Sequence, residues 1–261
     1  MKATGAKKQT LFLTGVNATV RALGLLLRVI LSRFLGAEIM GISELAQSVH
    51  MLAITPLTSG MPMAISRMTA RARETDKQKP LLAGIWLVRA ASAMLIPALL
   101  LLSPLLARWM GDTRVLPSLW FSAPCILVLG YSAALNGYCY GMEWSKIPAL
   151  SELIEQVSRL LFTLMLLAML ERLPAPWLAA VPVAATMVAE VIGLAFVLHA
   201  VRIPLYDTAS AARWRPSIFR LAAPATVTRL VQTLLRSLTA ILIPLKLQQS
   251  GLSAAESTAR L

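Results

Sequence analysis

Six arginines lie inside long apolar stretches of the sequence, where few other charged residues occur. They are Arg21, Arg28, Arg89, Arg159, Arg229 and Arg236. In a membrane-spanning helix, an arginine near the centre costs about 3 kcal/mol even on the lenient insertion scale, so it needs a hydrated cavity or an ionic partner. A guanidinium group binds oxyanions bidentately through its planar fork. Arginines gathered in one cavity therefore favour the binding of a phosphate or pyrophosphate.

The polar residues of three apolar stretches are spaced so that each set shares one face of a helix. The three sets are Asn17, Arg21, Arg28; Glu152, Glu155, Gln156, Arg159; and Arg229, Gln232, Arg236. Members of a set are mostly three, four or seven positions apart, which is the repeat of a helix face. We expect a central hydrated cavity that the first and third sets make cationic. We also expect an i,i+4 ion pair between Glu155 and Arg159.

Other roles stay open for these charges. The arginines can instead extend to the membrane interface, or form structural ion pairs with Glu44, Glu152 and Glu190. Glu190 is a candidate for a protonatable coupling site, and a structural hydrogen bond is its alternative role. The sequence contains no metal-site spacing of His, Cys and carboxylates, no Ser/His/Asp set and no Walker loop. We therefore expect no cofactor, no metal site and no enzymatic activity.

The composition indicates which elements must carry these residues. Hydrophobic residues make up 57% of the 261 residues and charged residues only 14%, whereas soluble domains are about 25% charged. A helix crosses the hydrocarbon core with about 20 mostly apolar residues. We predict an all-α, polytopic membrane helix bundle. Its seven expected spans are 9–33, 43–66, 81–107, 116–139, 148–170, 177–199 and 217–245.

The excess of basic residues predicts the orientation of these helices. The chain has 25 Lys and Arg against 12 Asp and Glu, a net charge of +13. Twelve Lys and Arg fall in the segments that lie inside if the N-terminus is inside, and four fall in the outer connectors. Cytoplasmic loops collect Lys and Arg. We predict a multi-pass protein of the cell (plasma) membrane with a cytoplasmic N-terminus, whose basic residues meet membrane lipids and no nucleic acid.

The first and third polar sets have the same internal spacing. Arg229 and Arg236 lie 208 residues after Arg21 and Arg28, respectively. Many transporters consist of two repeated helical halves with the substrate site between them. We expect two lobes, the second one incomplete because the chain is truncated at its C-terminus. The expected parts are an N-terminal six-helix lobe at 1–200, a cytoplasmic linker at 201–216 and the first helix of the second lobe at 217–261.

Four blocks of the sequence are similar to one family of membrane proteins. They are residues 10–41, 58–67, 136–142 and 148–159. In these blocks the chain resembles the polysaccharide biosynthesis (oligosaccharide flippase) family that includes stage V sporulation protein B, within the multidrug/oligosaccharidyl-lipid/polysaccharide exporter superfamily. The resemblance implies a V-shaped cavity between two lobes. It implies alternating-access translocation of a lipid-linked oligosaccharide or polysaccharide precursor, of the undecaprenyl-pyrophosphate type, in cell-envelope or spore-envelope biogenesis.

The first polar set departs from the pattern of the related lipid II flippases. Arg21 matches a cavity arginine of those proteins, but Leu27 and Arg28 stand where they carry an arginine–aspartate pair. This departure argues against lipid II itself as the substrate. Two alternatives stay open. One is a drug/cation antiporter of the same superfamily, which needs acidic cavity residues, and the other is a non-transporting membrane scaffold in spore-envelope assembly.

Overall fold

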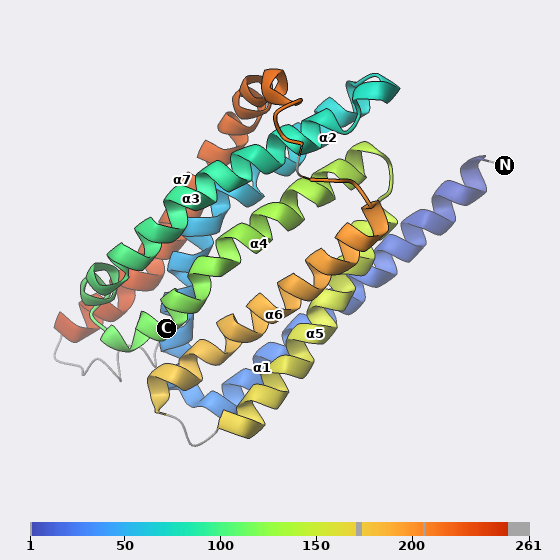
Figure 1. Cartoon of the computed structure of the whole chain (residues 1–261). Coiled ribbons are helices and arrows are strands. Elements are labelled where there is room, and N and C mark those ends of the chain that lie inside the picture. Colours follow the sequence, from blue (N-terminus) through green and yellow to red (C-terminus); the bar gives the residue numbers. More distant parts are fainter. Residues whose placement is uncertain (1, 171–173, 206, 250–261) are drawn as a thin grey trace.

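The described part of the chain is a bundle of long helices (Figure 1). The computed structural model describes residues 2–170, 174–205 and 207–249. Its helices are α1 (Lys2–Thr58), α2 (Gly60–Arg71), α3 (Lys79–Trp109), α4 (Leu116–Gly141), α5 (Lys146–Leu170), α6 (Ala175–Val201) and α7 (Arg215–Gln249). Short 3-10 turns in the connectors are η1 (Glu74–Asp76), η2 (Thr113–Val115) and η3 (Ala212–Trp214). These ranges contain no strand, which confirms the predicted all-α class.

Helix α1 consists of two arms joined by a kink at Gly36. Gly36 has φ 73° and ψ 171°, a conformation that residues with a Cβ rarely adopt. The kink separates an N-terminal arm, residues 2–35, from a C-terminal arm, residues 37–58. The first predicted span lies in the N-terminal arm, and the second begins in the C-terminal arm. One glycine thus turns the connector between two predicted spans into the bend of a single helix.

The second predicted span contains a break at Ser59, which lies between α1 and α2. Pro62 is the third residue of α2 and has no N–H to donate to the carbonyl of Thr58, so the helical ladder is interrupted there. At the break, the N–H and the hydroxyl of Ser59 both donate to the carbonyl of Thr55, at 3.2 and 2.6 Å. The span at 43–66 is therefore formed by two helices, not one.

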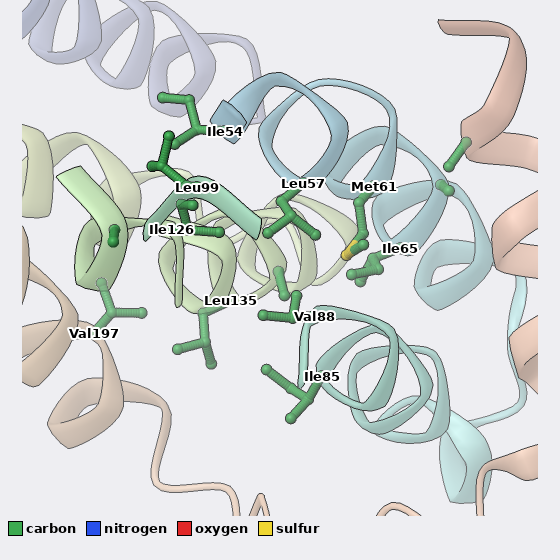
Figure 2. Packing of buried hydrophobic residues seen from close by; sticks show 14 of the residues in the cluster. Ile54, Leu57, Met61, Ile65, Ile85, Val88, Leu99, Ile126, Leu135 and Val197 are labelled. Carbon is green, nitrogen blue, oxygen red and sulfur yellow. The ribbon is translucent and has the colours of Figure 1, made fainter. Parts of the chain in front are cut away.

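The helices pack in two groups that meet where α4 lies along α6. The N-terminal arm of α1 packs with α5 and α6, and the C-terminal arm packs with α2, α3, α4 and α7. The first group buries Leu27, Leu31, Leu35, Leu167 and Val181. The larger core lies mainly in the second group, where Leu57, Ile85 and Leu135 are almost fully buried, and it reaches α6 at Val197 (Figure 2). The kink of α1 is thus what brings one helix into both groups.

The connectors alternate between the two ends of the bundle (Figure 1). At one end, Gln9 donates to Ser145 of the α4–α5 connector at 2.8 Å, and Arg213 lies 3.8 Å from Asp76, which joins the α6–α7 and α2–α3 connectors. At the other end, the kink of α1 meets the α3–α4 connector. The basic segments predicted to share one side of the membrane therefore lie at the same end of the bundle.

Three helical stretches among the described residues are long and apolar enough to cross a membrane. They are Glu74–Trp109, Thr113–Gly141 and Ala175–Val201.

Helix α7 packs against the C-terminal arm of α1, against α2 and against α3. The assignment of α7 to a second lobe stays a prediction.

Candidate functional site

Two of the predicted cavity arginines line one hollow between α7 and the C-terminal arm of α1. We call this the cationic hollow, and its volume is about 540 Å³. It is lined by Glu44, Gln47, Ser48, Met51, Thr55, Thr58, Ser59, Arg229, Thr233, Arg236 and Ser237. The walls therefore combine two guanidinium groups with several hydroxyls and a single carboxylate. The two guanidinium groups are the donors suited to an oxyanion, because hydroxyls such as those of Ser48 and Ser237 already donate to backbone carbonyls.

The residues of α7 that line the cationic hollow share one helix face. Arg229, Thr233, Arg236 and Ser237 are separated by four, three and one positions, so they lie within one broad stripe. Gln232 was predicted to belong to this face, but it is exposed and does not line the hollow. One helix position turns a side chain by about 100°, so Gln232 points away from the hollow that Thr233 lines.

Two hydrogen bonds fix the position of α7 against α1. The hydroxyls of Thr55 and Thr233 lie 3.3 Å apart, and the hydroxyl of Ser237 donates to the carbonyl of Ser48 at 3.1 Å. Interhelical hydrogen bonds of this kind contribute roughly 0.6 to 2 kcal/mol each within a membrane. They hold the arginine-bearing face of α7 toward α1.

Arg28 does not line the cationic hollow, but it forms an ion pair with Glu44, which does. Its Nη2 atom lies 3.2 Å from Oε1 of Glu44, and the ion pair spans the kink of α1. Arg28 and Glu44 line a second hollow of about 400 Å³, and Glu44 also lines the cationic hollow. The structure thus pairs this arginine with Glu44, one of the two roles left open by the sequence. Because both side chains are well exposed, the pair itself adds little stability.

Asn17 and Arg21 are exposed on the N-terminal arm of α1 and line neither hollow. Arg21 is seven residues from Arg28, which is about 10 Å along a helix. The N-terminal arm packs on α5 and α6, and in Figure 1 it lies apart from α7. The four-arginine array predicted from the sequence is therefore divided: Arg229 and Arg236 line one hollow, and Arg21 stands apart from it.

The second polar set forms a cluster with Glu190 between α5 and α6, in which Gln156 and Glu190 are buried, whereas Glu152 is exposed and lies outside it. Arg159 forms its ion pair with Glu190 of α6, with Nη2 and Oε1 3.1 Å apart, and its Nη1 donates to Gln156 at 3.3 Å. The predicted i,i+4 pair of Arg159 with Glu155 is therefore wrong. Glu155 instead accepts a hydrogen bond of 2.8 Å from the hydroxyl of Ser151. A residue on a neighbouring helix has displaced the local partner, as tertiary contacts regularly do.

The cluster cross-links α5 to α6. The hydroxyl of Ser151 also lies within 3.2 Å of the carbonyl of Gly193, and the side chain of Glu155 occupies the space that a Cβ on Gly193 would need. Glu190 is 6% exposed, so the bundle buries a carboxylate whose partner is a single arginine. Such a buried pair is costly to break, because one uncompensated charge is left behind.

Arg89 is also held by structural contacts. Its Nε donates to the hydroxyl of Tyr131 at 2.6 Å, and its Nη2 donates to the carbonyl of Leu205 at 3.0 Å. This arginine thus links α3 to α4 and to the segment before α7. It lies outside the cationic hollow.

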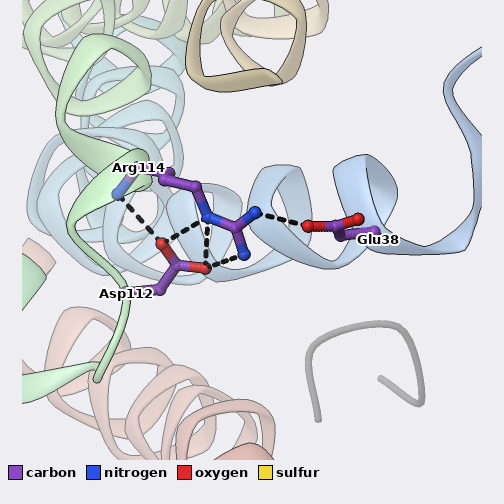
Figure 3. A network of polar contacts seen from close by, with 3 residues as sticks. All are labelled: Glu38, Asp112 and Arg114. Carbon is purple, nitrogen blue, oxygen red and sulfur yellow. Dashed lines mark hydrogen bonds and ion pairs between the residues drawn. The ribbon is translucent and has the colours of Figure 1, made fainter. Parts of the chain in front are cut away.

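A further charged network lies at the kink of α1 and was not found from the sequence (Figure 3). Arg114 of η2 bonds both carboxylate oxygens of Asp112, with Nη2 and Oδ2 2.7 Å apart, and also contacts Glu38. From the sequence, Arg114 is only one of the four basic residues in the outer connectors. The Asp-x-Arg spacing of 112 and 114 was the available signal. Within the described ranges, no group of His, Cys and carboxylates has the arrangement of a metal site.

Two known proteins are similar to this chain. Stage V sporulation protein B of Bacillus subtilis (strain 168) is 32% identical over 158 residues, which are 59% of this chain and 30% of that protein. A solved multidrug resistance MATE family transporter of the MOP superfamily, in its inward-facing conformation, matches with a TM-score of 0.71 at 15% identity. The match covers 91% of this chain and 55% of the transporter. Nearly the whole of this chain thus has the fold of a little more than half of the transporter.

The family follows from a match over nearly the whole sequence. A family model described as Polysaccharide biosynthesis protein matches residues 6–250. The match includes both arms of α1, the buried α5–α6 cluster and the arginine-bearing face of α7. It agrees with the resemblance seen in the sequence blocks. The chain therefore belongs to the polysaccharide biosynthesis protein family.

Proposed function

We propose that this chain forms the substrate-binding part of a membrane flippase that exports a lipid-linked oligosaccharide or polysaccharide precursor by alternating access. The observation that carries the proposal is the pair Arg229 and Arg236 in a hydroxyl-lined hollow of about 540 Å³ within a helix bundle. Membership of the polysaccharide biosynthesis family and the MATE-like fold support it. The similarity to stage V sporulation protein B favours a role in spore-envelope or cell-envelope biogenesis.

The chemistry of the hollow favours a pyrophosphate as the group that is bound. Two guanidinium groups supply charge-assisted donors, and the hydroxyl-bearing residues around them make the walls of the hollow polar. A carrier of the undecaprenyl-pyrophosphate type presents several anionic oxygens at the junction between its chain and its sugar. Arg28 contributes from the next hollow once its partner Glu44 is displaced or neutralised.

The orientation and the division into lobes belong to the same proposal. The basic segments lie at one end of the bundle, and we place that end, with the N-terminus, on the cytoplasmic side of the plasma membrane. Residues 1–200 form the first lobe, 201–216 the linker and 217–261 the start of the second lobe. Glu190 is the carboxylate that we assign to coupling, through its ion pair with Arg159.

The test replaces the two arginines in the full-length protein. Arg229→Ala and Arg236→Ala each remove a charged donor worth about 1.5 to 3 kcal/mol, so translocation of the lipid-linked glycan should fall roughly tenfold or more. Arg220→Ala is the matched control, because Arg220 is an exposed arginine of α7 outside the hollow. Unchanged translocation in both cavity variants contradicts the proposal. If envelope assembly then depends on connector residues instead, the scaffold role is supported.

A further inference from the structure

An apolar groove lies beside the cationic hollow. It has a volume of about 360 Å³ and runs between the C-terminal arm of α1, α3 and α7. Its walls include Leu52, Leu99, Leu102, Leu234 and Leu238. Its few polar residues include Ser48 and Ser237. We call it the apolar groove.

The groove and the hollow share one wall. Ser48 and Ser237 line both spaces, and the hydrogen bond between them, 3.1 Å from the Ser237 hydroxyl to the Ser48 carbonyl, forms the partition. Arg236 lines the hollow and not the groove, so its side chain lies on the polar side of this partition. A ligand that fills both spaces must be charged at one end and hydrocarbon at the other.

The groove opens at the surface of the bundle between exposed apolar side chains. Leu102 of α3 is 49% exposed and Leu238 of α7 is 39% exposed, although both line the groove. The stretch that contains Leu102 is apolar enough to span the membrane. A hydrocarbon chain can therefore enter from the lipid phase without crossing a polar surface.

We propose that the apolar groove holds the isoprenoid chain of the same lipid whose pyrophosphate lies in the cationic hollow. The inference rests on the proposed function and adds a second contact site for its substrate. A chain that leaves the bilayer for the groove gains little from the hydrophobic effect, because lipid tails are as apolar as leucine. Its packing against leucines instead fixes the distance of the pyrophosphate from Arg236.

The experiment labels the groove with a photoreactive lipid. Full-length protein in lipid nanodiscs is irradiated with an undecaprenyl pyrophosphate analogue that carries a diazirine on its chain, and the labelled peptides are identified by mass spectrometry. We expect labels on α3 and α7 residues of the groove, competed by unlabelled carrier. Leu102→Trp fills the groove and should reduce this labelling about fivefold or more, because overpacking a filled site is unfavourable.

Leu101→Trp is the matched control, since Leu101 is 80% exposed on the same helix and does not line the groove. It should leave labelling unchanged. Leu238→Trp fills the groove from α7 and serves as the second variant if Leu102→Trp does not fold. Equal labelling by a diazirine phosphatidylcholine, without competition by the carrier, overturns the inference, because the groove then holds bulk lipid. If Arg229→Ala and Arg236→Ala abolish translocation while the groove stays unlabelled, only this inference fails. If they leave translocation unchanged, the proposed function itself fails.

Discussion

Arg114 and Glu38 form an ion pair that fastens the connector between α3 and α4 to the bend of α1 (Figure 3). Glu38 lies two residues beyond Gly36, the residue at which α1 changes direction. Arg114 is itself held by Asp112, which is almost fully buried. The bend is therefore secured from outside the helix as well as by its own backbone.

The two carboxylates that contact Arg114 should contribute unequally to the stability of the protein. Arg114→Ala leaves the buried Asp112 uncompensated and should destabilise the protein by on the order of 3 kcal/mol. Glu38→Gln removes a partner whose side chain is 46% exposed, so we expect a loss of about 1 kcal/mol or less. Thermal unfolding of the detergent-solubilised protein measures both. Equal losses in the two variants would show that Asp112 is not the dominant partner.

Replacement by alanine should change the stability of the protein in opposite directions at two glycines of α1. Gly36→Ala forces a Cβ onto φ 73° and ψ 171°, which costs about 1 to 3 kcal/mol of backbone strain. Neither Gly36 nor Gly15 has a neighbouring atom within 4 Å of an added Cβ, so steric overlap does not enter. Gly15 is helical, and Gly15→Ala should stabilise by up to about 1 kcal/mol through helix propensity. Melting temperatures that move in the same direction for both variants contradict this assignment of the kink.

These residues show what the sequence could and could not predict. Helix periodicity placed Arg229 and Arg236 on one face, and the structure brings both to the same hollow. The same rule placed Arg21 and Arg28 on one face of the N-terminal arm. Whether that face meets α7 depends on the angle of the kink, which follows from the backbone at Gly36 and from its packing, not from periodicity.

The ion pair of Arg159 also could not be predicted from sequence spacing alone. Sequence spacing identifies Glu155 as a neighbour on the same helix, but it carries no information on the residues that α6 presents to α5. Glu190 is 31 residues from Arg159 along the chain and forms the ion pair. Local spacing therefore predicted which residues share a face, and packing decided which of them pair.

A double-mutant cycle should assign the partner of Arg159. Arg159→Leu leaves Glu190 as a buried unpaired carboxylate, and the loss should be partly recovered in the double variant Arg159→Leu/Glu190→Leu. We expect an interaction free energy of about 1 kcal/mol or more for this pair and a smaller one for Arg159 with Glu155. Denaturant unfolding of the four variants of each cycle gives both values. A larger interaction with Glu155 would restore the prediction made from the sequence.

Glu44 should weaken oxyanion binding in the cationic hollow, because its carboxylate lines that hollow and holds Arg28 at the same time. Glu44→Gln keeps the shape of the side chain, removes a negative charge near Arg229 and Arg236, and frees Arg28. Since Glu44 is partly exposed, we expect a modest increase in the affinity for inorganic pyrophosphate, roughly threefold, that diminishes as salt is raised.

Adding a carboxylate to the cationic hollow tests whether charge causes the change in pyrophosphate affinity. Gln47 lines the same hollow without a charge, and Gln47→Glu adds a carboxylate of nearly the same volume. It should reduce pyrophosphate affinity by a similar factor, again most strongly at low salt. Titration calorimetry of the full-length protein in detergent at two salt concentrations measures both variants. If both substitutions change the affinity in the same direction, the effect comes from altered packing between α1 and α7. If they change it in opposite directions, the anion is bound within reach of both positions.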